Sequence, residues 1–239
     1  MSSAGVPNHI SSAYEDFLGR FLQAAEDCNC TVSTPSRPIR SSFFPGADGA
    51  EVVFDTSLLL KKLPSRRLPG GKRLDVAIRA RETLSRTNWS ILKSTVYVNY
   101  FVVSDPAVYL VQCLHYDFVR GGQKSHPLFH LQLDSEMIPD DRLLELGLNL
   151  DEVRRESAAR ECWITTRIPT ADMTFPSVLY CIAGDHLPEA VFTQFAQQSN
   201  KIRERLPVLD FAELKSSMES SPRHFKSFHW FAHMFNERN

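Results

Sequence analysis

The sequence has no long apolar run. No segment approaches the roughly 18 to 20 consecutive apolar residues that a membrane-spanning helix needs. Residues 1–17 also lack the charged-then-apolar order of a signal peptide. We therefore expect a protein that makes no membrane contact and resides in the cytoplasm.

A surplus of charge is missing, and cysteine is scarce. The formal net charge is −1 over 239 residues, so the chain as a whole offers no electrostatic case for nucleic acid or membrane. The 5 cysteines are odd in number, which suits free thiols in a reducing compartment better than a disulfide framework. Cys28 and Cys30 could form half of a metal site, but no second Cys/His pair at zinc-like spacing follows them.

Several catalytic and cofactor-binding motifs are also absent. No Gly-x-Ser-x-Gly elbow, dinucleotide glycine fingerprint or Cys-x-x-Cys pair occurs. Residues 70–72 resemble a phosphate-binding loop only in part, because its first glycine is missing and Arg73 replaces the hydroxyl residue that would hold magnesium. His229 and His233 have the spacing of some zinc ligands, but Trp230 replaces the glutamate of a zinc protease. We interpret that segment as a packing helix.

The composition predicts a globular fold. With 43% hydrophobic and 23% charged residues, the chain can bury a sizeable core. We expect one α+β domain over residues 1–239, with a central sheet at about 50–135 and a mostly helical part at 140–239.

An antiparallel meander of about four strands should form the centre. Residues 95–103, 108–118 and 127–134 are rich in β-branched and aromatic residues and are joined by short connections. A further strand is expected near 51–60, after a surface loop at 31–50 that contains three prolines.

Helices from both ends of the sequence should pack on this sheet. The capping box Ser12-x-x-Glu15, followed by apolar residues at helical spacing, predicts a helix over about 12–28. Proline at the first turn predicts another helix that opens at Pro176. The remaining helical segments are expected at about 74–93, 140–162, 189–205, 211–218 and 223–235.

A dense group of polar residues lies on the last two predicted strands. Side chains alternate along a strand, so His115 and Asp117 share one face of the earlier strand, and His130 and Gln132 share one face of the later one. If the two faces coincide, these four groups come within cross-strand reach, with His126 at the entrance of the hairpin. Burying such a group on an apolar sheet is costly unless each member finds a partner.

Three interpretations of this group stay open. Histidine and aspartate could bind a divalent transition metal that activates water. Paired histidines could instead act as acid and base in phosphodiester cleavage, with Arg167 or Arg120 stabilising the developing phosphate charge. The third interpretation is a satisfied hydrogen-bond network, or a polar face turned to water on a half-covered sheet. The candidate catalytic residues are therefore His115, Asp117, His126, His130 and Arg167, with Gln132 and Arg120 as candidate binding residues.

Basic residues concentrate between Lys61 and Lys93. This stretch holds ten Lys and Arg residues against Asp75 and Glu82, and such a surplus can meet a phosphate backbone. A solvated charged face, balanced by acidic residues between 134 and 156, explains the pattern equally well. In the predicted exposed loop at 61–73, the candidate binding residues are Lys61, Lys62, Arg66, Arg67, Lys72 and Arg73.

Three short motifs follow one another in the second half of the chain. They are His115-Tyr-Asp117, His126-Pro-Leu-Phe-His130-Leu-Gln132 and Arg167-Ile-Pro169. Their order, over roughly residues 95–190, resembles a bacterial family of unknown activity, whose members have an aromatic-Asp strand end, a His-Pro-x-x-His-x-His hairpin and an Arg-Ile-Pro turn before a helix. Gln132 stands where that family tends to have a third histidine, which weakens a metal site of three imidazoles. The resemblance implies an accessory or effector role in bacterial defence or a toxin–antitoxin system.

The sequence therefore predicts a cytoplasmic component of a multi-protein bacterial system. It would bind a protein partner, or a nucleic acid, through the hairpin face or the basic loop. The alternative is a nuclease or phosphodiesterase that depends on histidine and aspartate. These residues identify neither a cofactor nor a particular metal.

Overall fold

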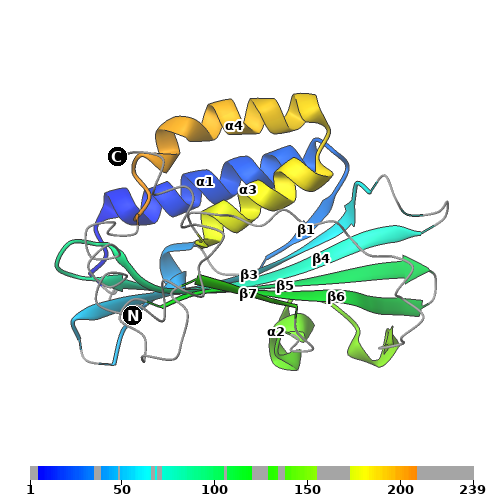
Figure 1. Cartoon of the computed structure of the whole chain (residues 1–239), viewed down its shortest axis with the longest axis horizontal. Helices are drawn as coiled ribbons and strands as arrows, with labels where there is room; N and C mark the ends of the chain where they lie inside the picture. The colour runs from blue at the N-terminus through cyan, green and yellow to red at the C-terminus, as the bar shows by residue number, and fades with distance from the viewer. Residues whose placement is uncertain are drawn as a thin grey trace, which may run out of the picture.

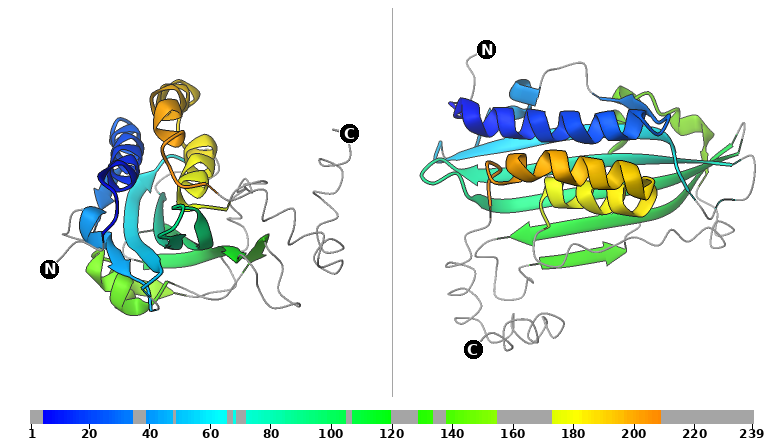
Figure 2. Two further views of the ribbon diagram at one scale, coloured as in Figure 1. Left: turned by 90° about the vertical axis from the view of Figure 1, so that its left-hand side faces the viewer. Right: turned by 90° about the horizontal axis from the view of Figure 1, so that it is seen from above.

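The computed structural model describes residues 5–34, 39–47, 49–65, 68, 72–104, 107–119, 129–133, 138–154 and 173–208. Within them, helices and a curled sheet confirm the predicted α+β class (Figure 1). The helices α1 (Asn8–Glu26), α3 (Phe175–His186) and α4 (Glu189–Arg203) form a layer on one face of the sheet. The end-on view in Figure 2 shows the sheet curling beneath this layer.

The sheet has eight strands, so the prediction of about four strands in a simple meander is wrong. Its order is β1-β3-β4-β5-β6-β7, with consecutive strands antiparallel from β3 to β7. In addition, β2 pairs with β3, and β8 pairs with β6 in parallel. The strands are β1 (Thr31–Ser33), β2 (Phe43–Pro45), β3 (Glu51–Leu63), β4 (Arg73–Ser85), β5 (Ile91–Ser104), β6 (Ala107–Val119), β7 (Phe129–Leu133) and β8 (Val153–Arg154).

The first helix is confirmed, but it starts earlier than the predicted residue 12. Pro7 occupies the N-cap position and no side chain caps the helix, so Ser12 does not form the predicted capping box. The apolar residues at helical spacing do face the sheet and the other helices, because Tyr14, Phe17 and Phe21 are all at most 2% exposed. The helical spacing therefore located the buried face correctly, although the capping pattern misplaced the first residue.

Two predicted helices are wrong. Residues predicted to be helical at 74–93 form β4, a turn and the start of β5. Every second residue from Leu74 to Ala80 belongs to the apolar core under the helices, and the residues between them face the other side, as strand residues do. The predicted helix at 140–162 stops early: α2 covers only Asp140–Glu145. Gly147, at φ 79°, ends it by donating its N–H to Leu144, and a 3-10 turn and β8 follow.

The predicted loop at 31–50 also contains regular structure. It holds β1, a 3-10 helix (Ile39–Ser42) and β2, and both strands pair with β3. The strand predicted at 51–60 is β3, and the strands predicted at 95–103, 108–118 and 127–134 are β5, β6 and β7. The predicted helices at 176 and 189–205 are confirmed as α3 and α4, with Pro176 in the first turn of α3.

Glu82 links the helical layer to the sheet. Its side chain is fully buried on the helix-facing side of β4, where it accepts hydrogen bonds from the Tyr14 hydroxyl of α1 (2.5 Å) and from Ser94 of β5 (3.1 Å). It also accepts one from the backbone N–H of Phe175 (2.7 Å), at the N-terminus of α3. A buried carboxylate at this position satisfies an otherwise unpaired helix N–H and suits the positive end of the helix dipole.

Among the described residues, the opposite face of the sheet is covered only at one end. There, Leu143, Leu146 and Leu148, in and after α2, pack with Ile138 on sheet residues such as Phe101. Figure 1 shows α2 alone among the labelled helices on this side. Among the described residues, none of the helices combines the length and the apolar character that crossing a bilayer requires. The predicted helices at 211–218 and 223–235, with His229 and His233, lie outside the described residues.

Candidate functional site

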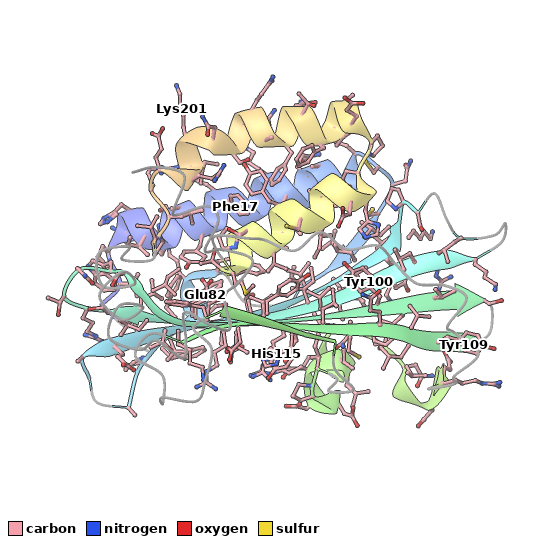
Figure 3. The ribbon with its side chains drawn as sticks, viewed as in Figure 1. Phe17, Glu82, Tyr100, Tyr109, His115 and Lys201 are labelled. Atoms are coloured by element: carbon pink, nitrogen blue, oxygen red, sulfur yellow. The ribbon has the colours of Figure 1, made fainter. Side chains whose placement is uncertain are left out.

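The sheet face that the three helices leave uncovered carries a regular grid of polar side chains. On this face, β4, β5 and β6 contribute odd-numbered residues, and the antiparallel register aligns them across the strands. Figure 3 shows His115 on the side of the sheet away from the helices. The rows of the grid are Arg79 with Tyr97 and His115, then Arg81 with Thr95 and Asp117, then Thr83 with Lys93.

These eight residues line a hollow with a volume of about 400 Å³, which we call the sheet hollow. Its size lies at the lower end of the range of small-ligand sites. Tyr97 lines the hollow and also packs against the apolar cluster beneath α2, so the hollow adjoins that cluster at one end.

Among the described residues that line the sheet hollow, three are cationic and a single one, Asp117, is a carboxylate. Arg79 is half-buried and pairs through Nη2 with Asp55 of β3 at 3.4 Å. Arg81 and Lys93 are exposed, and within the described part of the chain neither makes an ion pair. The lining therefore has an excess of positive charge although the whole chain carries a net charge of −1.

The other half of the sheet hollow is a small network around His115. The His115 ring stacks on the Tyr97 ring, with 4.4 Å between centroids and 17° between planes. His115 Nε2 lies 4.0 Å from Asp117 Oδ1, and the Thr95 hydroxyl donates to the same carboxylate oxygen at 2.7 Å. The side chain of Asp117 is thus oriented by Thr95, and the ring of His115 by Tyr97.

The register places the predicted hairpin residues opposite one another. His130 of β7 pairs with Asp117 of β6, and Gln132 pairs with His115. The prediction that these two strands are antiparallel neighbours is therefore confirmed. Only the backbone of β7 is described, and Arg120, His126 and Arg167 lie outside the described residues.

The predicted basic loop is partly strand. Lys61 and Lys62 belong to β3 and Arg73 begins β4, whereas Lys72 is exposed just before it; Arg66 and Arg67 lie outside the described residues. Lys61 donates from Nζ to the Gly147 carbonyl at 3.5 Å.

A buried carboxylate holds the irregular end of β3. Lys62 adopts a φ of 62° at a β-bulge, and its N–H donates to Asp75 at 3.0 Å, while Arg73 lies 3.7 Å from the same carboxylate. Burial raises the pKa of Asp75, and the hydrogen bond from Lys62 partly opposes that rise. These residues therefore have structural roles at this end of the sheet.

The described basic residues of 61–93 fall into separate groups in space. Arg73 and Arg79 are six residues apart on one strand, which corresponds to about 20 Å. The apolar cluster under α2 includes Ala77, which lies between them on the same face. The described residues of the predicted loop, Lys61, Lys62, Lys72 and Arg73, therefore lie apart from Arg79, Arg81 and Lys93.

Sequence reasoning missed Arg79, Arg81 and Lys93 as members of one site because it assigned them to a helix. On a helix, Arg81 would point away from Arg79, and Lys93 would lie about 21 Å along the axis from Arg79. The sequence pattern that indicates their common face is an alternation with a period of two in Val76-Ala-Ile-Arg-Ala-Arg-Glu-Thr83. The odd-numbered residues of this segment are polar from Arg79 onward.

The geometry of the sheet hollow suits an anion that carries oxygen atoms. Guanidinium, ammonium, hydroxyl and imidazole groups all donate hydrogen bonds to such a ligand. Within the described residues, no group of three or more His, Cys, Asp or Glu side chains is arranged to hold a metal ion. Comparison of the chain with protein-family models, with curated proteins and with solved structures gives no match.

Proposed function

We propose that this protein binds nucleic acid through the sheet hollow. The observation that carries the proposal is the convergence of Arg79, Arg81 and Lys93 in one hollow of about 400 Å³ on the uncovered sheet face. Cationic side chains that meet phosphates supply most of the sequence-independent affinity for nucleic acid. Phosphate contacts of this kind also come from hydroxyl groups such as that of Thr83.

The width of the hollow favours a single strand. Neighbouring strands of a sheet lie about 4.8 Å apart, so the three strands that form the floor span roughly 10 Å. A floor of this width matches one phosphate backbone better than the two backbones of a duplex groove. Tyr97 and His115 add aromatic surface, which single-strand binding proteins use together with cations.

The composition of the hollow supports binding more than catalysis. Among the described lining residues, His115 is the one histidine, and its ring is stacked on Tyr97. Acid–base cleavage of a phosphodiester needs a second proton-transfer group within hydrogen-bond reach of the reacting atoms. Asp117, the remaining titratable acid in the lining, accepts a hydrogen bond from Thr95.

The test is the salt dependence of binding to a labelled single-stranded oligonucleotide. We expect measurable affinity at about 50 mM salt and a large loss at about 200 mM. Arg81→Gln and Lys93→Gln should each reduce the slope of log affinity against log salt by about 0.7 to 1, because each removes one phosphate contact. Thermal melting of each variant should match the wild type, since both side chains are exposed.

Matched controls lie on the helix side of the molecule. Arg20 of α1 and Lys201 of α4 are exposed, and Figure 3 shows Lys201 on the far side of the molecule from His115. Arg20→Gln and Lys201→Gln remove the same charges and should leave affinity and salt slope unchanged. If all four variants weaken binding equally, or if the wild type does not bind at low salt, the proposal fails.

A second candidate function is phosphodiester cleavage. The observations that favour it are the 4.0 Å separation of His115 and Asp117 and the register that sets His130 opposite Asp117. If the protein is a nuclease, His115→Ala and His130→Ala should each reduce the rate of RNA or DNA cleavage by roughly a hundredfold or more. Incubation with manganese, zinc or a chelator distinguishes a metal-dependent reaction from a metal-free one. Intact substrate under all three conditions removes this candidate.

Membership of a bacterial multi-protein system, with a protein partner, stays a prediction that rests on the resemblance. It is tested by purifying the tagged protein with the products of neighbouring genes. A stoichiometric complex that survives gel filtration is the expected result.

A further inference from the structure

The sheet hollow is closed at one end by the sheet's own residues. Beyond the row of Arg79, Tyr97 and His115, the next row consists of Ala77, Asn99 and Cys113, which are at most 6% exposed. The backbone N–H of Ile138, a member of the apolar cluster under α2, donates to Asn99 Oδ1 at 2.8 Å. Within the described residues, the grid therefore ends against buried groups.

The opposite end is open. Lys93 and Arg81 are exposed, whereas Arg79 is 17% exposed and His115 13% exposed. Same-face residues along a strand are about 7 Å apart, so the row with Lys93 lies roughly 14 Å from the row with Arg79. A ligand thus meets exposed cations first and half-buried groups last.

From this gradient we infer that the sheet hollow recognises the phosphorylated end of a nucleic acid strand rather than an internal segment. The inference rests on the proposed function and names the part of the ligand that is bound. A strand that passes through a site needs an exit at both ends, and the described residues close one of them. The terminal phosphate would lie against Arg79, Tyr97 and His115, and the next phosphates against Arg81 and Lys93.

The chemistry of the inner row matches a terminal phosphate. A phosphomonoester carries about −1.5 to −2 charges near neutral pH and has three acceptor oxygens, whereas an internal phosphodiester carries one charge. Arg79 provides a guanidinium that is held in place through Nη2 by Asp55. Tyr97 and His115 line the hollow beside it and offer a hydroxyl and an imidazole. These groups can satisfy the additional charge and oxygen atoms that only a strand end presents.

The experiment compares four single-stranded probes of one base sequence: 5′-phosphorylated, 3′-phosphorylated, unphosphorylated and covalently circular. We expect a phosphate at one of the two ends to strengthen binding about tenfold over the unphosphorylated probe, the size of a charge-assisted hydrogen bond. The circular probe should bind no better than the unphosphorylated one. Arg79→Gln should remove the advantage of the phosphate, while Arg81→Gln and Lys93→Gln should weaken all linear probes alike.

A second variant guards against misfolding of the Arg79 variant. Tyr97→Phe removes only a hydroxyl and keeps the stacked ring, so it should fold and should reduce the advantage of the phosphate by about threefold or more. Competition by a nucleoside monophosphate and by inorganic phosphate shows whether the phosphate alone or the attached strand is recognised. Equal affinity of the circular and phosphorylated probes, or an unchanged phosphate advantage in both variants, overturns this inference while nucleic-acid binding stands. Failure of every probe to bind overturns the proposed function itself.

Discussion

At the scale of single residues, Glu82 breaks the apolar pattern of the helix-facing side of β4. Its neighbours on that side, Ile78, Ala80 and Leu84, are apolar and fully buried. A buried carboxylate is tolerated at this position because donors come from α1, from β5 and from the first turn of α3. One side chain thereby connects three elements that are distant in the sequence.

We predict that Glu82→Ala strongly destabilises the fold. The substitution leaves two hydrogen-bond donors, the Phe175 N–H and the Tyr14 hydroxyl, without their acceptor in a buried site. The expected loss is on the order of 3 kcal/mol or more of unfolding free energy, since each hydrogen bond to a charged group contributes about 1.5 to 3 kcal/mol. Chemical denaturation measured by circular dichroism gives this value.

Glu82→Gln is the matched variant for this measurement. The amide keeps an oxygen that can accept from Phe175 and Ser94, and the Tyr14 hydroxyl can rotate to accept from the amide nitrogen. Its loss of stability should therefore be clearly smaller than that of Glu82→Ala. Equal unfolding free energies for the wild type and Glu82→Ala would show that this contact does not hold the helices to the sheet.

At the scale of elements, strands with an apolar, β-branched composition could be predicted and strands with basic residues could not. β5 and β6 were found because runs such as Thr95 to Val103 have few interpretations other than an interior strand. β4 was missed because its arginines and Glu82 obscured an alternation that is otherwise regular. The two short strands β1 and β2 were missed because prolines in 31–50 suggested a loop, whereas β1 precedes all three prolines and β2 ends on Pro45.

The same limits explain how much of the site could be predicted. Alternation alone placed His115 and Asp117 on one face, and the pairing of β6 with β7 followed from the short connection. The register of β4 with β5, which brings Arg81 opposite Thr95 and Thr83 opposite Lys93, depends on a bulge between Thr83 and Leu84. No local sequence pattern specifies a bulge of this kind, so the cationic half of the hollow could be identified only from the structure.

At the scale of the whole molecule, the two faces of the sheet have different roles. The helix-covered face contains the larger apolar core, including most of the fully buried aromatic residues. The uncovered face is divided between the small cluster under α2 and the polar hollow. Because α1, α3 and α4 supply most of the burial, substitutions in the hollow should alter binding with little effect on stability, which makes the variants proposed above interpretable.

A buried histidine makes the stability of the whole fold depend on pH. His186, in the last turn of α3, is 9% exposed, and its Nδ1 donates to the Pro64 carbonyl at the end of β3 (3.2 Å). Burial lowers the pKa of His186 from its ordinary value of 6.5, while the hydrogen bond to Pro64 and the nearby charge of Asp185 partly oppose that shift. Below about pH 6.5 the unfolded chain therefore binds a proton that the native state excludes.

We predict that the native state loses stability as the pH falls below about 6.5, until His186 is protonated in the folded state as well. The raised pKa of Asp75 acts in the opposite direction at lower pH, because there the native state takes up a proton first. The comparison must therefore be made against His186→Gln, which keeps a donor for Pro64 but does not titrate. Denaturation midpoints measured at pH 7.5, 6.5 and 5.5 should fall more for the wild type than for His186→Gln. As a control, His9→Gln, at an exposed position, should leave the midpoints of the wild type unchanged. Parallel curves for the wild type and His186→Gln would mean that this histidine takes up its proton equally in both states.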